Sequence, residues 1–240
     1  MRNIAIIPAR GGSKRIPQKN IKLFLDKPII SYSIGAAIKS KLFDEIMVST
    51  DDTKVAEISK KYSASVPFMR SEKTANDFAI IADVVIEVLD NYKKAGIEFD
   101  NFCVLFATAP FITAKRLKEG YELMLKKGFD SVFTVLKFSY PIQRALKIEN
   151  DKLSMINPEY YEKRSQDLMP AYHDSGQFYW MSTKKFYKQK TLFSKNAGAI
   201  ILSEMEVQDI DTIEDWEVAE MKYKRIKQKT KTLIKRIKIK

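Results

Sequence analysis

The sequence contains few of the residues from which disulfide scaffolds and metal centres are built. Its 240 residues include one cysteine and one histidine. The cysteine, Cys103, has no second cysteine with which to form an intramolecular disulfide, and its place in the apolar run 102–105 predicts a buried core residue. The histidine, His173, has no cysteine nearby, which argues against a zinc site there.

Long hydrophobic stretches are also absent. No apolar run approaches the roughly 18 residues of a membrane span. No secretory signal pattern precedes Ile4, and the chain has no N-x-[ST] glycosylation sequon. These absences predict a cytoplasmic protein without a membrane span. With 45% hydrophobic and 30% charged residues, the composition is that of a globular protein, and the length allows one domain with a large core.

Positive charge is in excess, and most of the excess lies at the C-terminal end. The formal net charge is +12, and residues 222–240 carry eight lysines and two arginines without an acid, which leaves +2 for the chain before them. We therefore separate a nearly neutral body, residues 1–223, from a basic tail, residues 224–240.

The basic tail allows more than one interpretation. It is a solvated helix extension, or it attracts nucleic acid or an anionic membrane surface. No aromatic residue follows Tyr223, so we expect no specific nucleic-acid partner. Weak amphipathic docking stays open because the tail contains five aliphatic residues: Ile226, Leu233, Ile234, Ile237 and Ile239.

The N-terminal stretch IAIIPARGGSKRIPQKN, residues 4–20, has the composition of an anion-binding turn. Its apolar beginning predicts a buried strand that ends near Pro8. We expect Gly11 and Gly12 to adopt positive φ and bring backbone N–H groups close to an anion, with the Ser13 hydroxyl as a further donor. The glycine spacing matches neither a P-loop nor a dinucleotide-binding fingerprint, and a basic surface turn is the alternative. Four cations surround the glycines: Arg10, Lys14, Arg15 and Lys19.

Apolar runs and amphipathic stretches alternate along the body. Short apolar runs predict further strands over 45–49, 101–107, 131–137, 176–181 and 198–202. Spacings of three and four predict helices over 28–40, 55–62, 78–92, 114–127 and 212–223. The alternation predicts an α/β fold with a mostly parallel sheet that helices cover on both faces. Ligands of such sheets bind at the carboxyl ends of the strands, where the glycine loop begins.

The alternation stops between residues 138 and 172. This segment contains Pro141, Pro158 and Pro170, a turn at 149–151 and short alternating apolar patches. It predicts a β-hairpin that projects from the sheet rather than a second domain.

The run IIPARGGSKRIPQKN resembles the N-terminal signature of the acylneuraminate cytidylyltransferase (CMP-sialic acid synthetase) family, and the resemblance covers about residues 2–223. It implies a Rossmann-like nucleotidyltransferase domain over residues 1–223. Residues 138–172 would then be a dimerisation element that exchanges with a second subunit of a homodimer. It also implies a reaction in which the anomeric hydroxyl of a nine-carbon 2-keto sugar acid attacks the α-phosphate of CTP and releases pyrophosphate, with Mg²⁺ as cofactor.

The same resemblance implies roles for individual residues. Lys14, Arg10 and Asp211 would be catalytic, with Lys14 stabilising the α-phosphate and the leaving group. Arg70 matches an arginine near the nucleotide, and Asp77 matches more weakly. The set that the resemblance assigns to CTP is Arg10, Gly11, Gly12, Ser13, Lys14, Lys19, Asn20 and Arg70.

A pair of carboxylates near the C-terminal end is a candidate metal site. In an extended segment residues i and i+2 project to the same side, so Asp209 and Asp211 can converge on one cation. Mg²⁺ prefers one or two carboxylates together with phosphate oxygens and water. A helix-capping turn before Thr212 is the alternative.

The identity of the sugar depends on departures from the family pattern. Phe106 stands where sialate-activating members have a glutamine that faces the sugar, and Arg15 stands where most of them have glycine. These departures resemble the branch that activates pseudaminic acid, whose terminal methyl group suits a less polar pocket. Another nonulosonate, legionaminic or N-acetylneuraminic acid, is the first alternative, and a non-catalytic nucleotide- or polyanion-binding protein is the second. Candidate substrate contacts are Phe106, Gln143, Arg144, His173 and Gln177.

Overall fold

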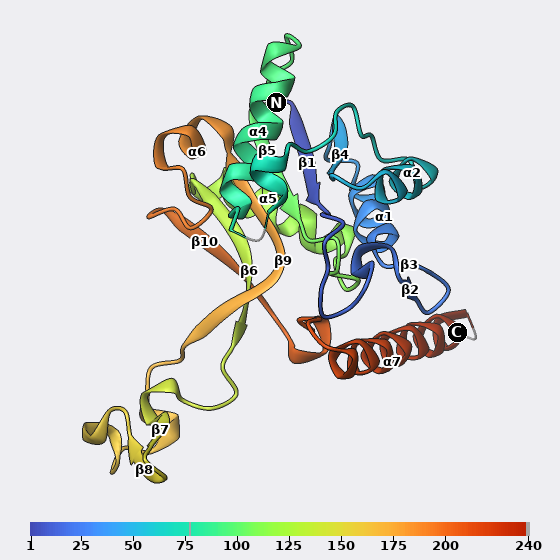
Figure 1. The fold of residues 1–240 in the computed structure, drawn as a ribbon. Coiled ribbons are helices and arrows are strands. Elements are labelled where there is room, and N and C mark those ends of the chain that lie inside the picture. Colours follow the sequence, from blue (N-terminus) through green and yellow to red (C-terminus); the bar gives the residue numbers. More distant parts are fainter. Residues whose placement is uncertain (77, 239–240) are drawn as a thin grey trace.

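A six-stranded sheet forms the centre of the computed structural model, which describes residues 1–76 and 78–238, with side chains as far as residue 229 (Figure 1). The strand order is β10-β6-β9-β5-β1-β4. β1 pairs in parallel with β4 and β5, and β10 pairs in parallel with β6, which confirms the mostly parallel sheet. β9 lies antiparallel between β5 and β6. The strands are β1 (Asn3–Pro8), β4 (Glu45–Ser49), β5 (Asn101–Leu105), β6 (Ser131–Lys137), β9 (Tyr172–Ser182) and β10 (Ala197–Leu202).

Helices cover both faces of the sheet, as the sequence predicts. Side chains alternate along β1, so Ala5 and Ile7 pack on one face and Ile4 and Ile6 on the other. Cys103 lies in the first of these cores, and burial raises the pKa of its thiol. The first face carries α1 (Ile30–Ser40), α2 (Thr53–Lys61) and α5 (Ala114–Lys127). The second carries α4 (Ile81–Lys94) and α6 (Thr183–Gln189), and a short helix, α3 (Glu72–Ala75), precedes α4.

Capping residues account for several helix boundaries. The Asp52 carboxylate accepts hydrogen bonds from two backbone N–H groups at the start of α2, and Gly128 ends α5 in the left-handed conformation. One predicted boundary is wrong. Phe78 lies before α4 with its side chain 92% exposed, because the helix begins only at Ile81.

A third apolar cluster joins the N-terminal loop to the C-terminal helix α7 (Ile213–Lys238). Ile16 from the loop, Phe24 and Ile210 pack with Trp216 of α7, and the Phe24 ring meets Trp216 edge to face. Two short strands, β2 (Leu23–Phe24) and β3 (Lys27–Pro28), form a hairpin beside this cluster. The cluster brings residues near 210 next to the glycine loop.

α7 extends further than the helix predicted over 212–223. It continues as one helix to Lys238, so the backbone does not change at the proposed boundary between body and tail, and residues 239 and 240 lie outside the described part. In the described residues no helix has the length and apolar character needed to cross a membrane.

The segment 138–172 projects away from the sheet (Figure 1). It contains a hairpin of β7 (Leu146–Glu149) and β8 (Lys152–Met155), joined by Asn150 and Asp151, both with positive φ, as a tight hairpin turn requires. Ile148 and Leu153 are largely exposed on the hairpin. Its role in dimerisation stays a prediction. Single turns of 3-10 helix complete the fold: η1 (Lys19–Ile21), η2 (Ile142–Arg144), η3 (Pro158–Tyr160), η4 (Ser165–Asp167) and η5 (Glu204–Glu206).

Candidate active site

A cavity of about 480 Å³ opens at the carboxyl ends of β1 and β5. The glycine loop after β1 forms one wall, the segment after β5 forms another, and residues around α3 and the start of α4 close the rest. The lining includes seven of the predicted site residues: Arg10, Ser13, Lys14, Lys19, Asn20, Arg70 and Phe106.

The glycine loop is held by contacts to the end of β4. The Gly11 N–H donates to Asp51 Oδ1 at 2.9 Å, and a Cβ atom at Gly11 would lie 2.7 Å from Asp52 Oδ2. The predicted positive φ at Gly11 and Gly12 is wrong, since neither has it. Gly11 is required by the close approach of Asp52, and the Cβ position of Gly12 faces open space.

Asn20 fixes the other side of the loop. Its side chain is 9% exposed, and its Nδ2 donates to the backbone oxygen of Arg10 at 2.8 Å. Gln18, in the left-handed conformation, turns the chain into η1, which carries Lys19 and Asn20. Asn20 therefore acts on the loop's shape in this structure.

Arg70 reaches the cavity from the segment after α2. Its guanidinium is buried and donates from Nε to Ser49 Oγ at 3.0 Å and from Nη2 to the Ser49 backbone oxygen at 2.6 Å. Burial lowers the pKa of Arg70, and the charge of Arg10 acts in the same direction, opposed by Asp51 and Glu87. Arg10 and Arg70 thus place two positive charges on the lining of one cavity, and an anionic ligand bound there would reduce their repulsion.

The two candidate metal ligands lie beside the loop. Ile210 is 1% exposed in the third cluster, so its neighbours Asp209 and Asp211 project away from it, as alternation predicts. Asp211 Oδ1 pairs with Arg15 Nη2 at 2.8 Å and with Lys19 Nζ at 3.4 Å. Lys19 lines the cavity, so it connects the cavity to the carboxylate pair.

In the described hydrogen bonds Thr212 and Asp215 cap α7 reciprocally, and the Thr212 hydroxyl accepts from the Asp215 N–H at 3.2 Å. Asp215 Oδ2 accepts from the backbone N–H groups of Asp211 and Thr212 and from the Thr212 hydroxyl, at 2.9 to 3.1 Å. These hydrogen bonds lower the pKa of Asp215. Asp215 holds Asp211 in place and leaves its carboxylate to face the loop.

The charge of the carboxylate pair fits a cation. Partial burial, and then the negative charge of Asp211, raise the pKa of Asp209, with Lys19 opposing them. A divalent cation between the two would relieve this repulsion. The described residues contain no group of three or more His, Cys, Asp or Glu side chains that could hold a metal. A metal here would therefore need ligands from the substrate as well.

Phe106 lines the cavity, and buried aromatic rings pack behind it. Its ring lies 5.8 Å from that of Tyr179, which stacks on Phe133 at 5.5 Å. The Tyr179 hydroxyl donates to the carboxylate of Asp174. Burial and these acidic neighbours, Asp209 among them, raise the pKa of Tyr179. The sequence pattern placed Phe133 and Tyr179 in predicted strands and gave no sign of the Asp174 contact.

Four candidate substrate contacts do not line this cavity. The Gln177 amide is buried and donates to the backbone oxygen of Glu206, and the His173 ring lies on Phe138 at the base of the projecting segment. Gln143 and Arg144 belong to the projecting segment itself, where Gln143 Nε2 donates to the Met169 backbone oxygen. Asp77 lies outside the described residues.

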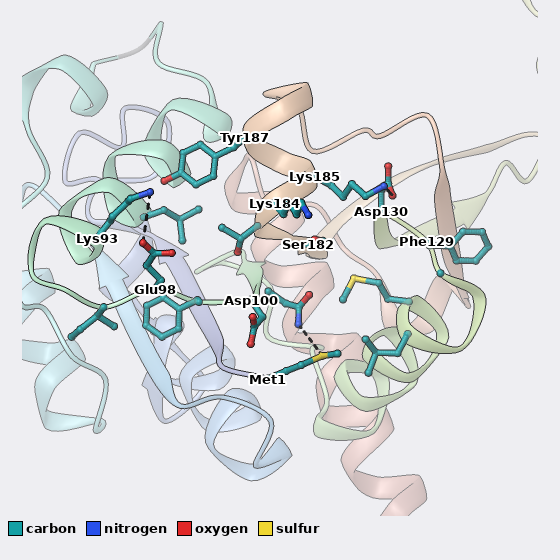
Figure 2. A pocket seen from close by; sticks show the side chains of 18 residues that line it. Met1, Lys93, Glu98, Asp100, Phe129, Asp130, Ser182, Lys184, Lys185 and Tyr187 are labelled. Atoms are coloured by element: carbon teal, nitrogen blue, oxygen red, sulfur yellow. Dashed lines mark hydrogen bonds and ion pairs between the residues drawn. The ribbon is translucent and has the colours of Figure 1, made fainter.

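A larger cavity, of about 660 Å³, lies at the opposite end of the sheet (Figure 2). It is lined by residues at the amino ends of the parallel strands, among them Met1, Asn101 and Asp130, with Lys184 and Lys185 from α6. Ligands of α/β sheets bind at the carboxyl ends, and the glycine loop does not reach this cavity. Its greater size therefore does not make it the candidate active site.

Together the fold and the carboxyl-end site define an α/β protein with a cavity lined by cations and a glycine loop. The family model for cytidylyltransferases matches residues 4–238. The chain belongs to the cytidylyltransferase family, and its role as an enzyme of this kind follows.

Particular relatives make the comparison sharper. The chain is 42% identical over 225 residues to a pseudaminic acid cytidylyltransferase of Campylobacter jejuni, covering 93% of this chain and 97% of that protein. It is 34% identical over 227 residues to the CMP-N,N'-diacetyllegionaminic acid synthase of Legionella pneumophila, with coverages of 92% and 95%. The structure is also similar to a solved CMP:2-keto-3-deoxy-manno-octonic acid synthetase complexed with CTP, with a TM-score of 0.70. The similarity covers 94% of this chain and 99% of that one. At 17% sequence identity it shows a shared fold.

Proposed function

We propose that this enzyme transfers CMP from CTP to pseudaminic acid and releases pyrophosphate. The observation that carries the proposal is the convergence of the loop cations and the Asp209/Asp211 pair beside one cavity, joined by the contact of Lys19 with Asp211. The 42% identity to a pseudaminic acid cytidylyltransferase supports the choice of sugar. A cytoplasmic location, where CTP is made, is part of this proposal.

In the proposed reaction the anomeric hydroxyl oxygen of the sugar bonds to the α-phosphorus of CTP, and the bond from that phosphorus to the oxygen bridging to the β-phosphate breaks. Arg10, Ser13 and Lys14 bind the triphosphate, and Lys14 stabilises the charge that grows on the α-phosphate and on departing pyrophosphate. Arg70 supports the nucleotide side of the cavity. Asp211 takes the proton of the attacking hydroxyl.

Mg²⁺ is the proposed cofactor, and Asp209 and Asp211 are the residues that would hold it together with phosphate oxygens of CTP. When bound, the ion neutralises phosphate charge and orients the triphosphate. In the structure the charge of Asp211 is balanced by Arg15 and Lys19. Arg15 therefore competes with the metal for the same carboxylate.

Metal binding can be measured without turnover, from the electron paramagnetic resonance of Mn²⁺ in the presence of CTP. We expect Asp209→Asn and Asp211→Asn to weaken Mn²⁺ binding by at least about tenfold, since each removes a ligand. Arg15→Gln should tighten it by roughly two- to fivefold, the range of an exposed ion pair. Unchanged affinity in both aspartate variants would contradict the metal site.

The Phe106 ring on the cavity lining supports the choice of a sugar with an apolar end. Phe106 lines the cavity with an apolar ring, backed by the buried Tyr179, where a hydroxylated tail would need hydrogen-bond donors and acceptors. The test is pyrophosphate release by the purified chain with CTP and either pseudaminic, N,N'-diacetyllegionaminic or N-acetylneuraminic acid. We expect kcat/KM to be highest for pseudaminic acid. A higher kcat/KM with either of the other two acids would show that pseudaminic acid is not the preferred substrate.

A homodimer completes the proposal. The projecting segment 138–172 exposes several apolar side chains that a second subunit can cover: Leu146, Ile148, Leu153, Ile156, Tyr161 and Met169. Gln143 and Arg144 are then substrate contacts made in the partner's cavity, which accounts for their distance from the cavity of their own subunit.

A further inference from the structure

The C-terminal part of α7 continues a face that the body uses for packing. Trp216 and Ala219 are buried in the third apolar cluster, and Tyr223 and Ile226 pack against it. These four residues follow one another at spacings of three and four, the repeat of a single helix face. Within the side chains that the structure describes, packing of α7 on this cluster reaches as far as Ile226.

The same spacing continues in the sequence beyond Ile226. α7 remains helical to Lys238, and Leu233 and Ile237 follow Ile226 by seven and eleven positions, which are repeats of the same face. Ile234 is adjacent to that face. The sequence therefore continues the apolar stripe of α7 beyond Ile226.

The rest of this segment is almost entirely basic. Residues 224–240 carry seven lysines and two arginines and no acid. Lys224, Arg225, Lys227 and Lys229 are all exposed. Most of the net charge of the protein is therefore concentrated on the segment 224–240, which also carries aliphatic residues at helical spacing.

We propose that the C-terminal turns of α7 dock on an anionic membrane surface, with the aliphatic face at the acyl boundary and the lysines against lipid phosphates. A basic helix with an aliphatic face fits a surface that is both negative and apolar. A second copy of the same helix would bring like charges together. Single-stranded nucleic acid would be expected to use aromatic side chains, and none follows Tyr223. The helix lies on the membrane and does not span it.

The test is co-sedimentation of the full chain with vesicles of phosphatidylglycerol and phosphatidylcholine or of phosphatidylcholine alone. We expect binding to the anionic vesicles only, weakening with added salt. The triple variant Lys229→Gln, Lys231→Gln, Lys235→Gln should weaken binding by roughly 100-fold, because each cation near such a surface contributes several-fold. The double variant Leu233→Ser, Ile237→Ser keeps every charge and should weaken it by at least about tenfold.

A matched control removes equal charge from another helix: Lys54→Gln, Lys60→Gln, Lys61→Gln on α2, whose lysines are exposed. It should bind anionic vesicles like the unchanged chain, and CTP binding by all variants checks that they fold. Wild-type binding by the serine variant would overturn the proposal, because charge alone would suffice. Failure to bind vesicles would also overturn it; salt-sensitive binding to DNA would then favour nucleic acid, and a concentration-dependent dimer lost in the serine variant would favour a second copy.

Discussion

At the scale of the residue, the shape of the glycine loop depends on the close approach of Gly11 to Asp52. Gly11→Ala places a Cβ 2.7 Å from Asp52 Oδ2 and 2.9 Å from Asp52 Cβ, so the loop or the start of α2 must move. We expect the free energy of unfolding, measured in urea, to fall by about 1–3 kcal/mol. Gly12→Ala is the matched control, since its Cβ meets nothing within 4 Å and should change stability by less than about 0.5 kcal/mol. Equal effects would contradict this account of the loop.

Lys14 is the residue on which turnover should depend most. Lys14→Ala removes a cation that lines the cavity, and losing one charge-stabilising contact to a developing phosphate charge lowers kcat by about 10²–10³-fold. Steady-state pyrophosphate release measures the effect, and an unaltered melting temperature shows that the fold persists. Lys27→Ala, an exposed lysine of β3, serves as the control and should keep wild-type kcat. Wild-type kcat in Lys14→Ala would remove this lysine from the mechanism.

Many of the residues that line the cavity could be predicted from the sequence, but the long-range contacts that hold the glycine loop could not. The loop residues and Phe106 meet in one cavity because each follows the carboxyl end of a strand, which sequence patterns locate. Arg70 follows no strand, and only the family resemblance pointed to it. The contact of Gly11 with Asp51 joins residues 40 positions apart, and no local spacing encodes it. The ion pair of Arg15 with Asp211 could not be predicted either, because the two residues lie far apart in the sequence.

At the scale of the element, the first turn of α7 determines where Asp211 points. Asp215→Ala removes the acceptor of four hydrogen bonds, so we expect a loss of about 1 kcal/mol in stability and a lower kcat, since Asp211 loses its backbone anchor. The pKa of Asp215 is lowered in the folded chain. The stability that its ionised carboxylate contributes is therefore complete above the unfolded pKa of about 3.9, and it is lost as the pH falls through the folded pKa. Acid unfolding curves of the variant should therefore be flatter below about pH 4. An equally steep curve would show that another carboxylate carries the acid dependence.

Two elements differ from the sequence prediction for physical reasons. The direction of β9 was not predicted, because alternation of strands and helices favours parallel neighbours, whereas the projecting segment returns the chain antiparallel between β5 and β6. α7 is longer than predicted because lysine and arginine are good helix formers and no glycine or proline follows Tyr223.

At the scale of the whole molecule, the proposed dimer predicts that two inactive variants can restore each other. If Arg144 acts in the partner's cavity, mixing Lys14→Ala and Arg144→Ala subunits gives mixed dimers with one intact site. We expect about a quarter of wild-type turnover, because half of randomly exchanged dimers are mixed and each has one such site. If Arg144 acts in its own subunit, both sites of the mixed dimer are damaged and no turnover returns. Light scattering of the separate variants confirms that each still dimerises.

The central claim is that the carboxyl-end cavity, and not the larger cavity of Figure 2, holds the triphosphate. A crystal structure with CTP and Mg²⁺ tests it most directly. We expect the α-phosphate within hydrogen-bond distance of Lys14 Nζ, with the metal between the phosphates and the Asp209 and Asp211 carboxylates. A triphosphate bound at the other end of the sheet, beside Lys184 and Lys185, would contradict the claim.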